Sequence, residues 1–139
     1  MSFLHASSRE QYVLRLAVRL GLTYYTKVPM SLQQVAKLEH ISGKYLEELI
    51  VPLKRQGFVS ARSGRNGGYL FIKSPRRVSV KDVLWPNALV PAVTACTTKA
   101  IHCPWEKSCG AKSVWQRVQS EVENTLSKVC LDSLLNHSY

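Results

Sequence analysis

The chain has 139 residues, of which 45% are hydrophobic and 20% are charged, so it suits one compact domain or a small domain with an extended arm. No apolar run approaches the roughly 18 residues of a membrane span. The first residues lack the basic and apolar regions of a signal peptide, so we expect a cytoplasmic protein. The 19 Lys and Arg outnumber the 9 Asp and Glu, and the net charge of +10 is typical of proteins that bind a polyanion such as nucleic acid.

The excess positive charge lies in the N-terminal part of the chain. Residues 1–85 carry 14 Lys and Arg against 5 acids, whereas residues 86–139 carry 5 against 4, so the two parts have net charges of +9 and +1. A generally basic, soluble surface would also give this total. The asymmetry nevertheless favours a polyanion that contacts residues 1–85.

A first helix is predicted over about residues 8–22. Apolar residues recur there at helical spacing, behind two overlapping capping boxes that pair Ser7 with Glu10 and Ser8 with Gln11. This pattern is typical of an amphipathic helix that packs on a core.

A pair of short helices is predicted next. Ser31 opens the first of them, a tight turn covers residues 39–41, and Ser42 caps the second. His40 occupies the turn position that commonly needs a positive φ. Pro52 lacks an N–H and clashes one turn back, so we expect a kink or a fresh helical turn that begins at this residue.

The remaining chain predicts a hairpin, a loop and a long helix. Residues 58–62 and 69–72 read as two strands joined by a turn-rich segment. A short helix capped by Ser79 follows. Residues 86–111 are proline-rich with poor periodicity, and from Ser113 apolar residues recur every three or four positions, as in a long amphipathic helix.

Residues 31–50 carry a helix-turn-helix pattern, and a basic hairpin follows directly. This order predicts a winged helix, whose second helix enters the major groove of DNA while the wing reaches the backbone or the minor groove. A helical hairpin for protein contact is the alternative. The candidate DNA contacts are Ser42, Lys44, Tyr45 and Glu47 in the second helix and Arg62 and Arg65 in the wing.

Three cysteines lie within the proline-rich loop. Cys96, Cys103 and Cys109 have the spacing C-x6-C-x5-C. The reducing cytosol disfavours disulfides, and structural zinc sites mostly use closer cysteine pairs. Thiolates at wider spacing suit an iron–sulfur cluster, while a zinc or other metal ion and free redox thiols stay open as alternatives. Cys130 is 21 residues further on and reads as a small buried hydrophobe.

Several segments together resemble the Rrf2 family of bacterial transcription regulators. The resemblance spans nearly the whole chain and is most specific over five short segments: 45–49, 52–53, 57–59, 67–69 and 82–83. It implies a homodimer that binds palindromic double-stranded DNA through winged helices. It also implies that residues 113–127 form a helix that crosses to the partner subunit.

In the sensing branches of this family, three loop cysteines hold an iron–sulfur cluster, and Cys96, Cys103 and Cys109 match them. The six-residue gap between Cys96 and Cys103 lies between the usual spacings of the [2Fe–2S] and [4Fe–4S] branches, and of the two we favour [2Fe–2S]. Lys112 stands where IscR-like members have a histidine ligand, and an ammonium has no lone pair for iron. The other candidate fourth ligands are Glu10, Gln11, His5 and His102.

The sequence as a whole predicts a mainly α fold with a small β-hairpin wing, a winged helix-turn-helix followed by a long C-terminal dimerisation helix. We expect a DNA-binding domain over 1–85, a cluster-binding loop over 86–112, and the dimerisation helix with a short final helix over 113–139. The expected function is a transcription regulator that senses iron–sulfur status or redox stress. A zinc site or thiol switch is the alternative. No catalytic motif suggests an enzyme.

Overall fold

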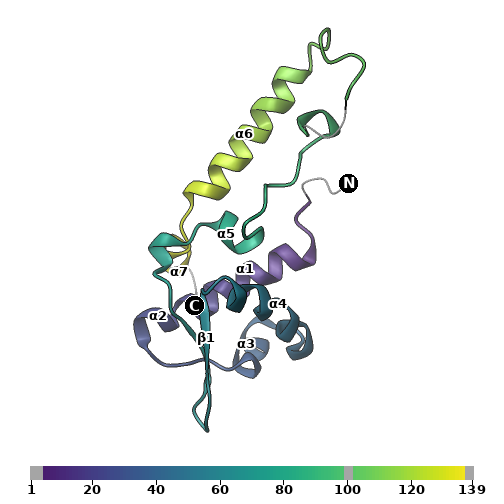
Figure 1. Cartoon of the computed structure of the whole chain (residues 1–139). Helices are drawn as coiled ribbons and strands as arrows, with labels where there is room; N and C mark the ends of the chain where they lie inside the picture. Colours follow the sequence, from purple (N-terminus) through teal and green to yellow (C-terminus); the bar gives the residue numbers. More distant parts are fainter. Residues whose placement is uncertain (1–4, 99–101, 137–139) are drawn as a thin grey trace.

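The computed structural model describes residues 5–98 and 102–136. It consists of a helical body and an arm (Figure 1). The hairpin of the body and the long helix α6 of the arm point toward opposite ends of the molecule. The mainly helical class with one small hairpin is confirmed.

Helix α1 (Ser8–Gly21) forms the centre of the body. Its Ser7–Glu10 capping box is present, as predicted. One face of the helix is fully buried, and it packs against α4, α5, α7 and β2. The buried apolar side chains of this face are Val13, Leu16, Ala17 and Leu20.

Helices α3 (Leu32–Glu39) and α4 (Gly43–Arg55) form the predicted helix-turn-helix. The capping box at the start of α3 is present, and Ser31 accepts a hydrogen bond from the backbone N–H of Gln34 at 3.2 Å. His40 ends α3 with a φ of 55°, which confirms the left-handed turn. Histidine tolerates this conformation better than a β-branched residue does.

Pro52 lies inside α4 and does not start a new helix, so the expectation of a fresh turn at this position is wrong. The missing hydrogen bond leaves only the carbonyl of Glu48 without its helical donor, and Glu48 is exposed to water. The helix ends instead in a Schellman motif. Gly57 has a φ of 75°, and Phe58 N–H reaches the carbonyl of Leu53 at 3.0 Å.

The wing consists of β1 (Val59–Arg62) and β2 (Gly68–Phe71), paired antiparallel in the register Val59↔Phe71. The segment just before α3 also pairs with β2, which the sequence does not predict. Met30 and Tyr69 exchange two backbone hydrogen bonds of 3.0 and 2.8 Å. A Cβ at Gly68 would lie 2.5 Å from the Met30 carbonyl, so only glycine permits this approach.

The other elements close the body. Helix α2 (Thr23–Thr26) and the 3₁₀ helix η1 (Pro75–Arg77) are short additions, and α5 (Val80–Leu84) begins at the predicted Ser79 cap. The chain then leaves the body through η2 (Ala95–Thr97).

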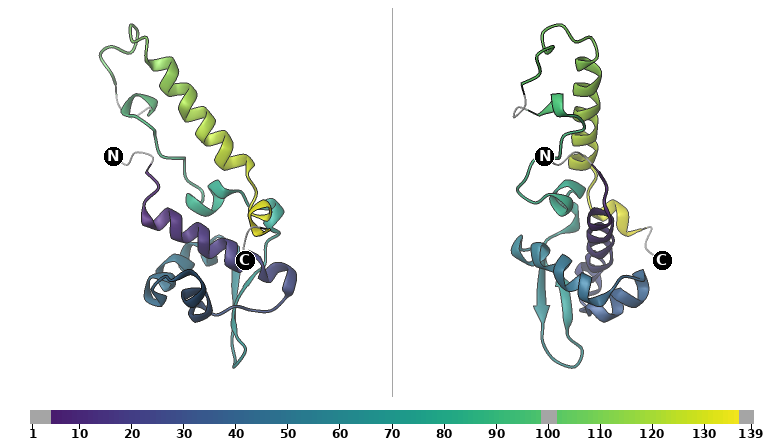
Figure 2. Two further views of the ribbon diagram at one scale, coloured as in Figure 1. Left: turned by 180° about the vertical axis from the view of Figure 1, so that it is seen from behind. Right: turned by 90° about the vertical axis from the view of Figure 1, so that its right-hand side faces the viewer.

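The arm is built on α6 (Lys112–Lys128), which returns the chain to the body. The last helix, α7 (Asp132–Leu135), packs against α1, and the side chains of Leu131 and Leu135 are buried there. Most of the α6 helix extends away from the body in both further views (Figure 2), and the helix contacts the body at α5 and through Leu126. Of its 17 residues, all of them described, none is buried.

A carboxylate fastens α3 to α1. Glu39 forms ion pairs with Arg15, at 2.8 Å, and with Arg19. Partial burial acts to raise the pKa of the Glu39 carboxyl, but the hydrogen bonds from the two guanidinium groups outweigh it and lower the pKa.

Candidate DNA-binding surface and cysteine pocket

The first turns of α4 present the predicted contact residues to solvent. Ser42 is the N-cap of the helix, although its side chain makes no capping hydrogen bond. Lys44 and Glu47 are exposed as well. All three side chains are therefore accessible to base edges and phosphates when a recognition helix of this kind lies in the major groove of DNA.

Tyr45 has a packing role in addition to its predicted one. Its ring is half-buried and meets the ring of Tyr12 edge-on, with the centroids 5.9 Å apart. The guanidinium of Arg15 lies 5.5 Å above the same Tyr12 ring. Tyr45 thus connects the exposed surface of α4 to α1.

The wing places two cations beyond the body. Arg62 ends β1, and its side chain folds back to donate to Ser60 Oγ at 2.8 Å. Arg65 lies in the turn at the hairpin tip and is exposed. The wing and the first turns of α4 therefore both expose cationic groups, which are the groups that contact a phosphate backbone.

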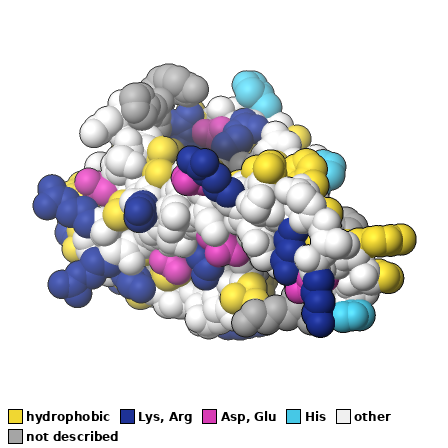
Figure 3. Space-filling view, turned by 90° about the horizontal axis from the view of Figure 1, so that it is seen from above, with side chains coloured by type: hydrophobic (Ala, Val, Ile, Leu, Met, Phe, Trp, Pro, Cys, Tyr) yellow, Lys and Arg dark blue, Asp and Glu magenta, His cyan; other side chains and the backbone are white. Residues whose placement is uncertain are grey.

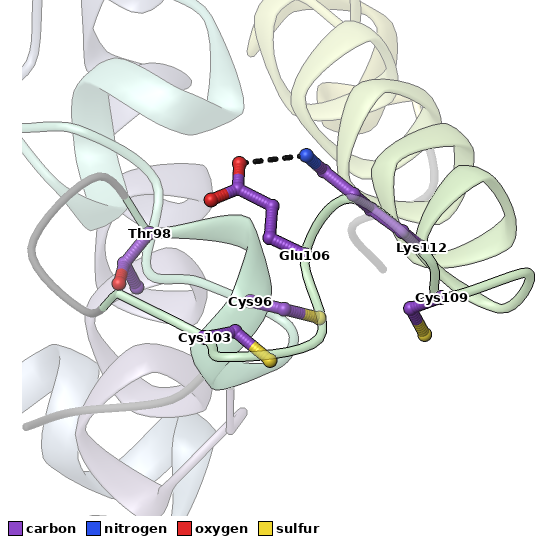
Figure 4. Close-up of a pocket in the computed structure, with 6 residues that line it drawn as sticks. All are labelled: Cys96, Thr98, Cys103, Glu106, Cys109 and Lys112. Carbon is purple, nitrogen blue, oxygen red and sulfur yellow. Dashed lines mark hydrogen bonds and ion pairs between the residues drawn. The ribbon is translucent and has the colours of Figure 1, made fainter.

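The three loop cysteines line one small pocket at the far end of the arm. Cys96 lies in η2, and Cys103 and Cys109 lie in the turns before α6. The six lining residues are labelled in Figure 4: Cys96, Thr98, Cys103, Glu106, Cys109 and Lys112. No three Cys, His, Asp or Glu side chains among the described residues are grouped closely enough to hold a metal ion.

Gln119 of α6 fixes the segment that carries Cys96. Its Oε1 accepts from the Val93 N–H at 2.7 Å and from Thr97 Oγ1 at 3.3 Å, and its Nε2 donates to the Pro91 carbonyl at 3.3 Å. One side chain thus joins the cysteine loop to the long helix. The loop also contacts the helix-turn-helix, because Asn87 donates to Gln56 at the end of α4 at 3.1 Å.

Lys112 and Glu106 form an ion pair at the edge of the pocket, with 2.7 Å between Nζ and Oε1. The hydrogen bond from the ammonium lowers the pKa of the Glu106 carboxyl. Figure 4 shows both charged ends on one side of the pocket, away from the three sulfur atoms. Lys112 therefore occupies the predicted histidine position as an ion-paired ammonium.

The other candidate fourth ligands do not line this pocket in the described part of the chain. The Glu10 carboxylate accepts from the Ser7 N–H at 3.1 Å, and the Gln11 amide donates to the Ala6 carbonyl at 2.9 Å. His5 is exposed near the N-terminus. The His102 side chain is 88% exposed, and its Nδ1 lies 3.9 Å from Glu106.

The end of the molecule that carries the arm exposes charged and hydrophobic side chains side by side. Viewed from the cysteine end, basic side chains alternate with acidic ones, and hydrophobic side chains gather toward one edge (Figure 3). On α6 an apolar groove is exposed, with Val114, Val118 and Val122 along it and Arg117 and Glu121 beside it. Val114 is 57% exposed and Trp115 is 40% exposed.

Comparison with known proteins gives the same family that the sequence segments indicate. Residues 6–137 match the family model described as "Rrf2: Iron-dependent Transcriptional regulator". The chain is 25% identical to protein rrf2 of Nitratidesulfovibrio vulgaris over 93% of its length and 85% of the relative. It is 28% identical to the regulator IscR of Photorhabdus laumondii, over 78% of this chain and 66% of the relative.

Solved structures show the same fold. The structure of CymR, the global cysteine regulator of Bacillus subtilis, has a TM-score of 0.78 at 23% identity and covers 99% of this chain and 100% of that one. The structure of T. potens IscR has a TM-score of 0.74 at 25% identity and covers 98% of this chain and 89% of that one.

The fold and its exposed basic surface define a winged-helix, DNA-binding transcription regulator and not an enzyme. The chain belongs to the Rrf2 family. Within the residues that the structure describes, no helix is long and apolar enough to cross a bilayer.

Sequence reasoning overlooked two residues of the arm. Gln119 lies next to the apolar stripe of α6. A polar residue at that place indicates a hydrogen bond to another segment, but the sequence does not identify the segment. Glu106 lies midway between Cys103 and Cys109, which is a stronger signal, because a carboxylate between thiols can act as a metal ligand.

Proposed function

We propose that this protein is a homodimeric transcription regulator whose DNA binding responds to an iron–sulfur cluster held by Cys96, Cys103 and Cys109. The observation that carries the proposal is that all three thiols line one pocket on the arm. Similarity to IscR over 78% of the chain supports it independently. Thiol groups at this spacing suit a cluster in donor chemistry, and we favour the [2Fe–2S] form.

When bound, the cluster would supply a charged and redox-sensitive centre. The residues of the chain provide the connection to DNA. Gln119 joins the cysteine segment to α6, and Asn87 joins the start of the loop to the end of α4. A change in the loop can therefore bias the position of α4 through these contacts and shift the population between DNA-binding geometries.

The homodimer is supported by the exposed apolar groove of α6. A helix with an apolar stripe and no buried residue gains stability only by packing against another surface. A second copy of the same helix presents a matching stripe, and two-fold symmetric dimers are the commonest soluble assemblies. Such a dimer would place two wings on a palindromic DNA site.

The DNA contacts that we assign are Ser42, Lys44, Tyr45, Glu47, Arg62 and Arg65. Glu47 differs from the others because it is an acid in a basic surface. It can accept from a cytosine N4 amine and repel other base edges, so it would restrict the choice of site. We expect Glu47→Ala to broaden the set of operators that the cluster-free protein binds. Equal affinities across operator variants before and after the change would contradict this role.

Anaerobic purification tests the cluster. We expect a brown protein with visible charge-transfer bands, bound iron and sulfide, and loss of all three in Cys103→Ala. Cys130→Ala is the matched control, because Cys130 is a half-buried thiol outside the pocket. Colourless wild-type protein without iron would contradict the proposal.

A thiol switch is the second candidate. The specific support is similarity over 95% of this chain to CymR, the global cysteine regulator of Bacillus subtilis. The same anaerobic sample separates the candidates. A colourless protein that forms a disulfide between pocket cysteines on mild oxidation, and loses DNA affinity as it does so, would favour the switch. A colourless protein with bound zinc would favour a metal site.

A further inference from the structure

A second cavity of the arm lies between the loop and α6. Its volume is about 510 Å³, which is within the range of small-molecule sites. Leu89, Val90 and Ala92 form its apolar side, where Val90 is buried and Leu89 is 89% exposed. The cavity is therefore open to solvent and large enough for the apolar body of a small organic ligand.

The polar side of this cavity is formed by Thr97, Thr98, Gln119 and Glu123. The two threonine hydroxyls spend their protons on the loop itself. Thr97 donates to the Thr94 carbonyl at 2.8 Å, and Thr98 donates to the Ala95 carbonyl at 3.0 Å. A hydroxyl has one proton and two lone pairs, so both threonines keep acceptor capacity for a ligand.

Gln119 and Glu123 continue the same pattern. The Gln119 amide donates to the Pro91 carbonyl at 3.3 Å and to Glu123 Oε1 at 2.8 Å, which uses both of its N–H groups. Glu123 is exposed, and it is the one charged residue among the described residues that line the cavity. These side chains therefore offer a ligand one carboxylate and several lone pairs, while their own donors are already bonded within the chain.

We propose that this cavity binds a small organic cation, a primary amine with an apolar body. An ammonium has three donors and no acceptor, so it complements the carboxylate of Glu123 and the threonine oxygens. A carboxylate or phosphate ligand would instead meet a like charge and find no free side-chain donor among these residues. The apolar body would lie against Val90 and Ala92 and remove them from water.

The bound amine would contact two elements at once, because Thr97 belongs to η2 and Glu123 belongs to α6. It would hold the segment that carries Cys96 against the long helix, in addition to the bonds of Gln119. The inference goes beyond the proposed function, since no cysteine is among the described residues that line this cavity.

The test is a titration of the full chain with 2-phenylethylamine and with 2-phenylethanol, which has the same apolar body without the charge, followed by ligand-observed NMR. We expect saturable binding to wild type, with the amine preferred about fivefold, as for an exposed ion pair. Glu123→Gln should bind both compounds equally. Glu121→Gln is the matched control, an exposed carboxylate beside the other groove of the same helix, and should keep the preference.

Ala92→Phe tests the apolar side independently of charge. The added ring should fill the cavity and weaken both compounds at least about tenfold, because their apolar bodies lose their burial. Absence of saturable binding to wild type, an unchanged preference in Glu123→Gln, or unchanged binding in Ala92→Phe would overturn the inference. Absence of binding together with a weaker dimer in Glu123→Gln would assign the site to a cation of a second copy and overturn it as well. Selective amine binding by protein without iron would support the inference while contradicting the proposed cluster.

Discussion

The winged-helix body and the arm are built in opposite ways. Every apolar residue on the inner face of α1 is buried, and α7 returns from the end of the chain to cover the same core. The arm has a helix of 17 residues without one buried side chain, and a loop fixed to it largely by Gln119. The body thus has a packed core within a single chain, whereas the arm leaves apolar side chains exposed.

In the function that we propose, the two tasks of a regulator would fall to these two kinds of structure. DNA recognition requires a rigid scaffold that holds α4 and the wing in place, which a packed core provides. Sensing requires a segment whose conformation changes at a small free-energy cost. Segments with few buried contacts have the lowest local stability, so they change conformation most readily.

Leu16→Ala should have the largest effect, because Leu16 is fully buried in α1. The cavity and the lost burial should lower the free energy of unfolding by about 2–5 kcal/mol. Urea unfolding measures it. Leu38→Ala is the matched control on the 50% exposed leucine of α3, with an expected loss of about 0.5 kcal/mol or less. Similar losses in the two variants would contradict the assignment of the core.

Val118→Asp should break the arm while leaving the body folded. A carboxylate in the apolar groove of α6 would be buried against the partner helix, so the dimer dissociation constant should rise about 100-fold, or about 2.7 kcal/mol. Sedimentation equilibrium and far-UV circular dichroism measure assembly and folding. Ser120→Asp, an exposed position on the same helix, should dimerise normally. An unchanged dimer in Val118→Asp would exclude this groove as the interface.

Glu39→Gln should lower the stability of the body by about 1–3 kcal/mol at neutral pH, since two guanidinium groups lose their charged partner. The folded-state pKa of Glu39 lies below its unfolded value of about 4.3. Its contribution is therefore present above that value and disappears as the pH falls through the folded pKa. Unfolding curves between neutral and acidic pH should converge for wild type and variant. A constant gap would refute the linkage.

Gln119→Leu should loosen the cysteine loop without unfolding the body. Loss of its hydrogen bonds should cost about 1 kcal/mol locally and speed hydrogen exchange at the Val93 amide about fivefold. Gln116→Leu, an exposed neighbour on α6, is the control and should leave this exchange unchanged. Equal protection in both variants would mean that other contacts hold the loop.

Arg65→Ala should have the smallest effect, because it removes one exposed cation from the wing tip. If Arg65 contacts a phosphate, the slope of log affinity against log salt should fall by about one, with a similar loss for every sequence tested. Lys107→Ala in the cysteine loop should not change the slope. A fall in affinity for only one sequence would instead indicate a base contact.

Local chemistry made much of the body predictable. Capping boxes at Ser7, Ser31 and Ser79 marked three helix starts, and His40 adopted the turn conformation that its position requires. These signals act within four residues of the chain, which is the range that sequence patterns report.

Features that depend on distant contacts were not predictable. The Met30–Tyr69 pairing joins residues 39 positions apart, and the bonds of Gln119 to the loop span more than 20. The helix continues through Pro52, and Glu48, whose carbonyl loses its donor, is an exposed residue in the structure, which the sequence does not report. The cysteine spacing indicated a shared site, but the position of Glu106 beside Lys112 emerged only from the fold.

The central claim is that the state of the arm controls DNA reading by the body. Fluorescence anisotropy with an operator selected from random DNA tests it on one anaerobic preparation, measured before and after removal of the cluster. The account predicts at least a tenfold change in affinity or a changed preference between operators in wild type, and neither in Cys103→Ala. Identical binding by the cluster-loaded and cluster-free wild type would contradict it.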